Sequence, residues 1–244
     1  MADSTARNKR LWMRVAVGYA VCLHLFLGLL IFETDLVPKL KSGSSGEPLS
    51  HFQNMLIYHG WGDDSVPDNA VIFLGDSITQ GLATAAVAPH SVNYGIGGET
   101  TTQLLEALPS YRSLNRARAI VLAIGINDIV GGKQKGLKER YNKIVGALPR
   151  GTPLVWSAVM PVKVATWMKM EQSDITEANR EIKLLCEMRG NCVFVNTVGL
   201  LGDTNGQIVQ RYYLDDGVHL SHDGYRQWIS ALKQAIDSPP GGKE

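Results

Sequence analysis

The chain has 244 residues, of which 45% are hydrophobic, and 24 Lys and Arg against 23 Asp and Glu give a formal net charge of +1. This length suits one medium α/β domain with an appendage and is ample for a buried core. The apolar content excludes a wholly disordered chain, and the Gly and Pro content excludes a collagen-like or low-complexity one. A near-zero net charge without a basic patch gives no support for nucleic-acid binding.

The N-terminus separates into a basic segment and an apolar one. Residues 1–14 carry four basic residues and one acidic residue, so their net charge is +3 and that of the remaining chain is −2. Residues 15–32 contain no Asp, Glu, Lys or Arg, and as a helix they would span about 27 Å, close to the hydrocarbon thickness of a bilayer. We therefore expect a transmembrane signal anchor with a cytoplasmic N-terminus and an extracytoplasmic domain, which would be periplasmic in a bacterium.

Two other interpretations of residues 15–32 stay open. A cleaved signal peptide has a shorter apolar region and a small-residue cleavage site, and the residues that follow position 32 offer no good one. A buried core helix would normally show a polar face, which this segment lacks. The anchor interpretation divides the rest of the chain into a linker at 33–46, a catalytic or binding domain at 47–238 and a flexible tail at 239–244.

The domain alternates between strand-like and helix-like patterns. Apolar runs predict buried strands at 70–74 and 119–124, and a short strand candidate at 91–94 and further strands at 153–159 and 192–196 complete a set of five. Longer patterned stretches predict helices at about 101–108, 133–148, 175–189 and 222–236. For the third helix we expect an N-cap at Ser173 or Asp174 and a stop at Gly190. This alternation favours an α/β fold with a five-stranded parallel sheet and helices on both faces, in which ligands bind at the carboxyl ends of the strands.

Residues capable of chemistry follow the first three strands. Ser77 lies in a Gly-Asp-Ser turn, where its N–H would begin a helix at a position that favours negative charge. The glycine-rich loop 95–98 lets backbone N–H groups approach a substrate oxygen closely. Asn127 offers a neutral amide donor. Each feature alone is weak, because such turns, glycine loops and Asn-Asp caps are common in proteins without catalytic activity.

A further pair lies near the C-terminus. Asp216 and His219 are three residues apart, so one turn can point both side chains the same way and let the carboxylate orient the imidazole. A lone Asp-x-x-His is more often structural than catalytic. Four weak signals in a fixed order, however, make one strong signal.

The set of motifs resembles the SGNH (GDSL) hydrolase superfamily from about Val71 to Trp228, and residues 93–101 resemble the branch that contains the platelet-activating-factor acetylhydrolase catalytic subunits. The resemblance implies a three-layer α/β/α fold without a metal or cofactor. It also implies that Ser77 is the nucleophile, His219 the general base and Asp216 its orienting acid.

The same resemblance implies an oxyanion hole made by the Ser77 N–H, Gly98 and Asn127. Gly97 stays an alternative to Gly98, since a loop shift of one residue would exchange them. We expect Asp76 to brace the nucleophile loop through backbone N–H groups. The remaining histidines of the domain are expected to be structural or on the surface: His51, His59, His90 and His222.

The expected function is a membrane-anchored serine esterase or acylhydrolase that cleaves acyl or acetyl esters of a small molecule, lipid or glycan through an acyl-enzyme. An O-acyltransferase acting on a cell-surface glycan and a non-catalytic tethered binding module remain alternatives. The Met- and Trp-rich segment 160–170 is either a surface connection packed on the core or an adaptable apolar wall beside Ser77.

The three cysteines lack the number and spacing of a disulfide scaffold or a zinc site. Cys22 lies in the apolar segment. Cys186 and Cys192 flank a predicted helix-to-strand turn, and an oxidising compartment would permit a disulfide between them. With the turn geometry unspecified, we expect two buried free thiols instead.

Overall fold

The computed structural model of the chain describes residues 2–33, 49–165 and 167–238. The chain divides into two compact units, residues 1–48 and 49–244. Residues 34–46 of the predicted linker and the predicted tail at 239–244 lie outside the described residues.

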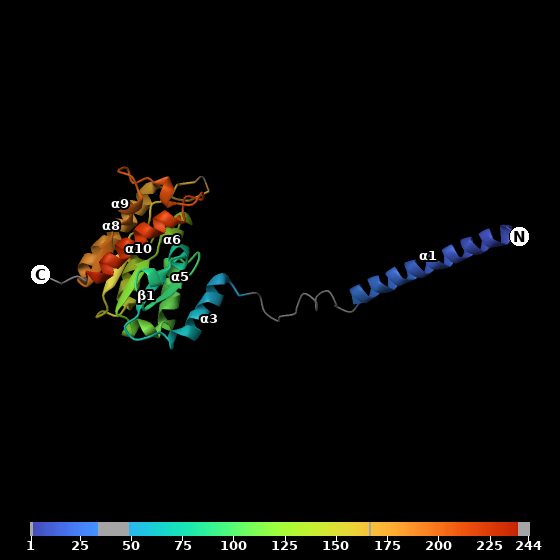
Figure 1. Cartoon of the computed structure of the whole chain (residues 1–244), viewed down its shortest axis with the longest axis horizontal. Helices are drawn as coiled ribbons and strands as arrows, with labels where there is room; N and C mark the ends of the chain where they lie inside the picture. The colour runs from blue at the N-terminus through green and yellow to red at the C-terminus, as the bar shows by residue number, and fades with distance from the viewer. Residues whose placement is uncertain (1, 34–48, 166, 239–244) are drawn as a thin grey trace. The chain divides into compact units, whose positions relative to one another are not determined.

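The first unit contains helix α1 (Ala2–Glu33), which includes the predicted anchor at residues 15–32 (Figure 1). The side chains that are described in this helix, at 12–26 and 29, are all exposed. Across the described part of the chain, no helix combines the length and apolar character needed to cross a membrane. The prediction of a transmembrane helix is therefore not supported by the structure, in which the side chains at 27, 28 and 30–32 of the predicted segment are not described.

The second unit is built on a five-stranded parallel sheet, as the sequence predicts. The strands are β1 (Val71–Gly75), β2 (Ser91–Gly95), β3 (Ala119–Ala123), β4 (Leu154–Ser157) and β5 (Cys192–Val195). Their order in the sheet is β2-β1-β3-β4-β5, and every neighbouring pair is parallel. This order has its topological switch point between β1 and β3, where a crevice forms at the carboxyl ends of the strands.

Helices cover both faces of the sheet and complete an α/β/α sandwich (Figure 1). In β1, Ile72 and Leu74 face one core while Val71 and Phe73 face the other, and all four are fully buried. The first core is covered by α3 (His51–Asp63), α5 (Thr101–Ala107), α6 (Ile126–Val130), α7 (Leu137–Ala147) and α8 (Gln172–Arg189). The second is covered by α4 (Ser77–Gln80), α9 (Thr197–Leu201) and α10 (His222–Asp237). Short 3₁₀ helices lie at Thr84–Ala86, Leu108–Ser110, Arg112–Arg116 and Gln210–Tyr212.

Two of the predicted helix starts are wrong. Helix α8 begins earlier than expected, because its N-cap is Glu171 and the Asp174 carboxylate accepts a hydrogen bond from the Glu171 N–H at 2.8 Å. Asp174 is thus the third residue of the helix, and Ser173 is not the cap either. Helix α7 begins at Leu137 instead of 133, because Gly136 before it adopts a left-handed conformation with φ of 79°.

Cys186 and Cys192 form a disulfide, so the prediction of two free thiols is wrong. Cys186 lies near the end of α8 and Cys192 begins β5. Gly190 between them has a φ of 81°, and this turn brings the two Cα atoms to 5.0 Å, within the normal range for bridged cysteines. Cys22 is free and exposed in α1.

Loss of the disulfide is expected to lower the free energy of unfolding by about 2 kcal/mol, because the bridge closes a short loop in the unfolded chain. The measurement is urea unfolding of the Cys186→Ala, Cys192→Ala double variant against the unmodified chain, with Cys22→Ala as the control that retains the bridge. In denaturant without reductant, the unmodified chain should show one reactive thiol, that of Cys22. Three titrating thiols would contradict the bond.

Candidate active site

Ser77 is the first residue of α4, directly after β1, and its side chain is half-buried. Asp76 is the N-cap of this helix, and its carboxylate accepts a hydrogen bond from the Ile78 N–H at 3.0 Å. This is the bracing role expected for Asp76. The Ser77 N–H donates to no group in the described part of the chain, so it is free to meet a ligand oxygen.

A chain of hydrogen bonds links Ser77, His219 and Asp216. Ser77 Oγ lies 2.9 Å from His219 Nε2, and His219 Nδ1 lies 2.7 Å from Asp216 Oδ2. The other oxygen of Asp216 accepts the backbone N–H groups of Val218 and His219, each at 2.9 Å. Burial opposes ionisation of Asp216, but these hydrogen bonds, led by that from His219, outweigh it and lower the pKa of the carboxyl. Asp216 is therefore a carboxylate at neutral pH.

The two candidate glycines of the loop after β2 differ in their hydrogen bonding. The Gly97 N–H donates to Gln80 Oε1 at 2.7 Å. Among the described residues, the Gly98 N–H has no partner, and Gly98 is exposed with open space where a side chain would stand. Its φ of 78° is left-handed and favours glycine. Only Gly98 of the two therefore has an N–H available for a substrate oxygen.

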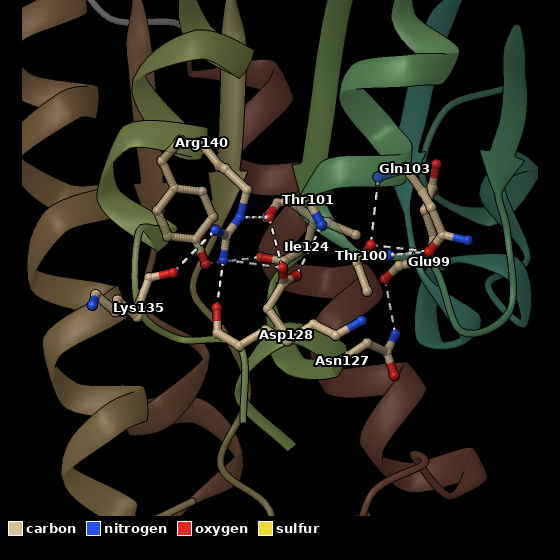
Figure 2. Close-up of polar contacts among 11 residues, drawn as sticks. Glu99, Thr100, Thr101, Gln103, Ile124, Asn127, Asp128, Lys135 and Arg140 are labelled. Carbon is tan, nitrogen blue, oxygen red and sulfur yellow. Dashed lines mark hydrogen bonds and ion pairs between the residues drawn. The ribbon is translucent and has the colours of Figure 1, made fainter. Parts of the chain in front are cut away.

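Asn127, the second residue of α6 after β3, lies against the peptide between Glu99 and Thr100. Its Nδ2 donates to the Glu99 carbonyl oxygen at 2.9 Å, which leaves the second amide hydrogen free (Figure 2). Because β2 and β3 flank β1 in the sheet, the residues that follow these strands reach the same edge as Ser77. The sequence motifs thus come together at the carboxyl ends of three adjacent strands.

Residues that the sequence interpretation did not use also contact this site. The Gln80 side chain ties α4 to the glycine loop through Gly97, and Asn93 Nδ2 donates to the Thr79 carbonyl at 2.8 Å. The His51 ring also borders Gly97, with Nε2 3.5 Å from the position where a Cβ would stand. Asn93 lies within the motif at 93–101 and Gln80 in the short helix that Ser77 begins, so both could have been considered, whereas no sequence signal connects His51 to residue 97.

The segment 160–170 packs mainly on the core. Met160, Met168 and Met170 are buried, whereas Trp167 is exposed, and Thr166 lies outside the described residues. The methionines therefore follow the packing interpretation. The segment also contacts the loop between Asp216 and His219, because the Lys163 N–H donates to the Gly217 carbonyl at 2.9 Å.

The other histidines fit the expected structural or surface roles. His59 is buried and its Nδ1 lies 3.0 Å from the Tyr111 hydroxyl, and burial lowers its pKa to about 4. His90 and His222 are exposed.

Two buried acids lie beside the site. Glu99 is 1% exposed and neither of its carboxyl oxygens has a hydrogen-bond partner among the described residues. Burial, followed by the nearby charge of Asp76, raises the pKa of Glu99 to about 9, so its carboxyl is neutral at pH 7. Burial also raises the pKa of Asp76, to about 7, against the opposing effect of the hydrogen bond from Ile78.

A serine bonded to a histidine, which is bonded in turn to an aspartate, is the arrangement of serine hydrolases, here at the edge of an open parallel sheet. A match to a family model then identifies the family of the chain. The chain belongs to the GDSL-like lipase/acylhydrolase family, which it matches over residues 73–227. No curated protein matched the chain.

Solved structures with the same fold include a Streptococcus pneumonia protein provisionally named a platelet activating factor, which is 22% identical with a TM-score of 0.69 over 89% of this chain and 99% of its own. A lipase/acylhydrolase from Enterococcus faecalis is 15% identical with a TM-score of 0.60, over 72% of this chain and 100% of its own. An acetylxylan esterase from Geobacillus stearothermophilus is 18% identical with a TM-score of 0.53, over 69% of this chain and 94% of its own. These likenesses establish the shared fold.

The Glu99→Gln variant is expected to flatten the pH dependence of stability. An unfolded glutamate ionises near 4.5, whereas folded Glu99 keeps its proton up to about pH 9, so the folded chain binds more protons between these values. Stability contributed by Glu99 therefore falls as the pH rises through this window, and glutamine removes that fall. The measurement is the free energy of unfolding at pH 5 and pH 8.

Glu177→Gln is the matched control. Glu177 is exposed, and its hydrogen bond with Arg180 lowers its pKa, so its ionisation contributes nothing between pH 5 and pH 8. This control should lose as much stability on going to pH 8 as the unmodified chain does. An equal loss in Glu99→Gln would show that the Glu99 carboxyl is ionised in the folded state.

Proposed function

We propose that the protein is a serine esterase or acylhydrolase that cleaves carboxylic esters through an acyl-enzyme. The observation that carries the proposal is the hydrogen-bonded chain in which Ser77 Oγ lies 2.9 Å from His219 Nε2 and His219 Nδ1 lies 2.7 Å from Asp216. A carboxylate at Nδ1 holds the proton of the neutral imidazole on that nitrogen. Nε2 is then the acceptor that faces the serine.

The first half of the reaction forms the acyl-enzyme. Ser77 Oγ attacks the ester carbonyl while its proton passes to His219 Nε2, and the carbonyl oxygen becomes an oxyanion. The Ser77 N–H, the Gly98 N–H and the free Asn127 amide hydrogen are the donors for this oxyanion. The ester C–O bond then breaks, and the imidazolium of His219 protonates the leaving alcohol.

The second half releases the acid. A water molecule attacks the acyl carbonyl and gives its proton to His219, so the same oxyanion donors act again. The bond between Ser77 Oγ and the acyl carbon breaks, the proton returns to Ser77, and the carboxylic acid leaves. The side chains of His219 and Asp216 are 42% and 47% exposed, so the site is open enough for an ester carried on a large molecule.

The substrate class follows from this openness and from the names of the relatives. One solved neighbour is a lipase/acylhydrolase and another an acetylxylan esterase, so acyl esters of lipids and acetyl esters of glycans are both candidates for this chain. No step of the proposed reaction uses a metal or cofactor.

Ser77→Ala and His219→Ala are each expected to lower the rate of p-nitrophenyl acetate hydrolysis at least about 10³-fold, because nucleophile and base act as a unit. His222→Ala is the matched control: this histidine is 85% exposed on α10, outside the hydrogen-bonded chain, and the variant should keep the original rate. A fluorophosphonate probe should label the unmodified chain but not Ser77→Ala.

Equal rates in the unmodified chain and Ser77→Ala would refute the mechanism. If the probe labels Ser77 but the acyl group passes to a sugar acceptor faster than to water, the protein is an acyltransferase that uses the same residues.

We also propose that the N-terminal segment anchors the enzyme to a membrane, with the hydrolase domain outside the cytoplasm. Residues 15–32 carry no Asp, Glu, Lys or Arg and follow a segment of net charge +3. The disulfide between Cys186 and Cys192 is of a kind that persists in oxidising compartments. The described apolar side chains of α1, such as Leu25 and Phe26, are exposed and need an apolar environment.

If this is correct, the full chain should stay with membranes in high salt and in carbonate and be extracted by detergent. A Leu25→Arg, Leu29→Arg double variant should partition into the soluble fraction, because two charges in the apolar core of a bilayer each cost about 3 kcal/mol or more. Recovery of the unmodified chain in the carbonate supernatant, or of a mature chain starting near residue 40, would refute the anchor.

A further inference from the structure

Two hydrogen-bonded pairs of residues connect the loop after β2 to the start of α6. Asn127 Nδ2 donates to the Glu99 carbonyl, and next to it the Thr101 N–H and hydroxyl donate to the two oxygens of Asp128, each at 2.8 Å (Figure 2). The first pair joins Asn127 to the peptide between Glu99 and Thr100, one residue beyond Gly98. The second joins Asp128, the residue after Asn127, to Thr101, two residues after Glu99, so the segments that carry the two oxyanion donors are tied together at two points.

The Asp128 carboxylate is 1% exposed, and a buried charge destabilises a fold unless it is paired and hydrogen-bonded. Arg140 of α7 provides the pairing: its Nη2 lies 3.3 Å from Asp128 Oδ1, and its Nε donates to the Thr101 hydroxyl at 2.7 Å. Figure 2 shows the guanidinium beside the Asp128–Thr101 contact and Lys135. It also donates hydrogen bonds to the backbone carbonyls of Lys133 and Lys135. Asp128 is thus held from two sides.

The contact between Asp128 and Thr101 fixes both distance and direction, because each carboxylate oxygen takes a different donor of the same residue. Thr101 is the first residue of α5, whose N-cap is Thr100, so little free chain separates it from Gly98. Asp128 lies inside α6, directly after Asn127. A change in the Asp128–Thr101 contact therefore alters where the Gly98 N–H and the Asn127 amide point relative to each other.

We propose that Asp128 is a positioning residue of the oxyanion hole: its contact with Thr101, charge-balanced by Arg140, keeps the Gly98 and Asn127 donors aimed at one oxygen. Asp128 itself is buried and does not touch the substrate. This proposal rests on the proposed esterase function. It assigns the second residue of the Asn127-Asp128 pair a role in turnover in addition to its role in the fold.

Asp63 provides a matched control for a purely structural role. It is also 1% exposed and accepts a hydrogen bond from a backbone N–H, that of Ser113 at 3.0 Å, together with one from the Tyr94 hydroxyl at 2.8 Å. Asp63 contacts neither Thr101 nor Asn127. Asp63→Asn and Asp128→Asn therefore make the same chemical change in similar surroundings, one of them away from the oxyanion donors.

The main test is the steady-state kinetics of p-nitrophenyl acetate hydrolysis by the full chain. Asp128→Asn replaces one acceptor oxygen by an amide NH₂, so kcat is expected to fall about 10–100-fold with KM within about 2-fold. Asp63→Asn is expected to lower the midpoint of thermal unfolding and to leave kcat unchanged. In an Asn127→Ala background, Asp128→Asn should cost at most about 3-fold more, since one of the donors that it positions is already absent.

A second pair of variants covers the case in which Asp128→Asn does not fold. Thr101→Val removes the hydroxyl donor and keeps the N–H, so kcat should fall, whereas Thr101→Ser keeps both donors and should restore kcat to near the original value. The positioning role is refuted if Thr101→Val keeps the original kcat, or if Asp128→Asn costs as much with Asn127→Ala as without it. Failure of the esterase proposal is distinguishable, because the unmodified chain would then match Ser77→Ala.

Discussion

The candidate active site depends on three parallel strands whose carboxyl ends lie in register. Gly75 at the end of β1 pairs in register with Gly95 of β2 and Ala123 of β3, so the three chains leave the sheet at the same height. They leave it very close together: a Cβ on Gly75 would stand 2.2 Å from the Ala123 carbonyl oxygen, and one on Gly95 would stand 2.5 Å from the Gln80 nitrogen. Only glycine fits at these two positions, and this close approach places the turn that carries Ser77 beside the loops that carry Gly98 and Asn127.

Two buried acids near these strand ends are treated in opposite ways. Asp128 is ion-paired to Arg140 and accepts two hydrogen bonds, and it joins helices α5 and α6. Glu99 lies between the glycine loop and Thr101, and its carboxyl has no hydrogen-bond partner in the part of the chain that the structure describes, so burial keeps it protonated. The buried Asp128 side chain thus has partners that compensate for its burial, whereas the buried Glu99 carboxyl avoids the cost of a buried charge by keeping its proton.

The sequence predicted what depends on local pattern and missed what depends on distant contacts. Four of the strands were predictable because each contains a short apolar run, the mixed segment 91–94 was only a short strand candidate, and Asp216 could be paired with His219 because one turn joins them. The choice between Gly97 and Gly98 rests on the Gln80 side chain, and the disulfide rests on the left-handed turn at Gly190, so neither follows from spacing. Helix α3 was missed although its capping box, Ser50 with Gln53, was readable, because its apolar residues show no clear helical stripe.

The disulfide lies at the amino ends of the strands, whereas the candidate active site lies at their carboxyl ends. Cys192 begins β5 and pairs in register with Leu154, the first residue of β4, whereas Ser77 follows the far end of β1. The bridge therefore fastens the layer of α8 to the sheet without entering the arrangement of donors around the serine. A change in the redox state of the surroundings would therefore alter the stability of the fold. We expect the turnover rate of each folded molecule to stay the same.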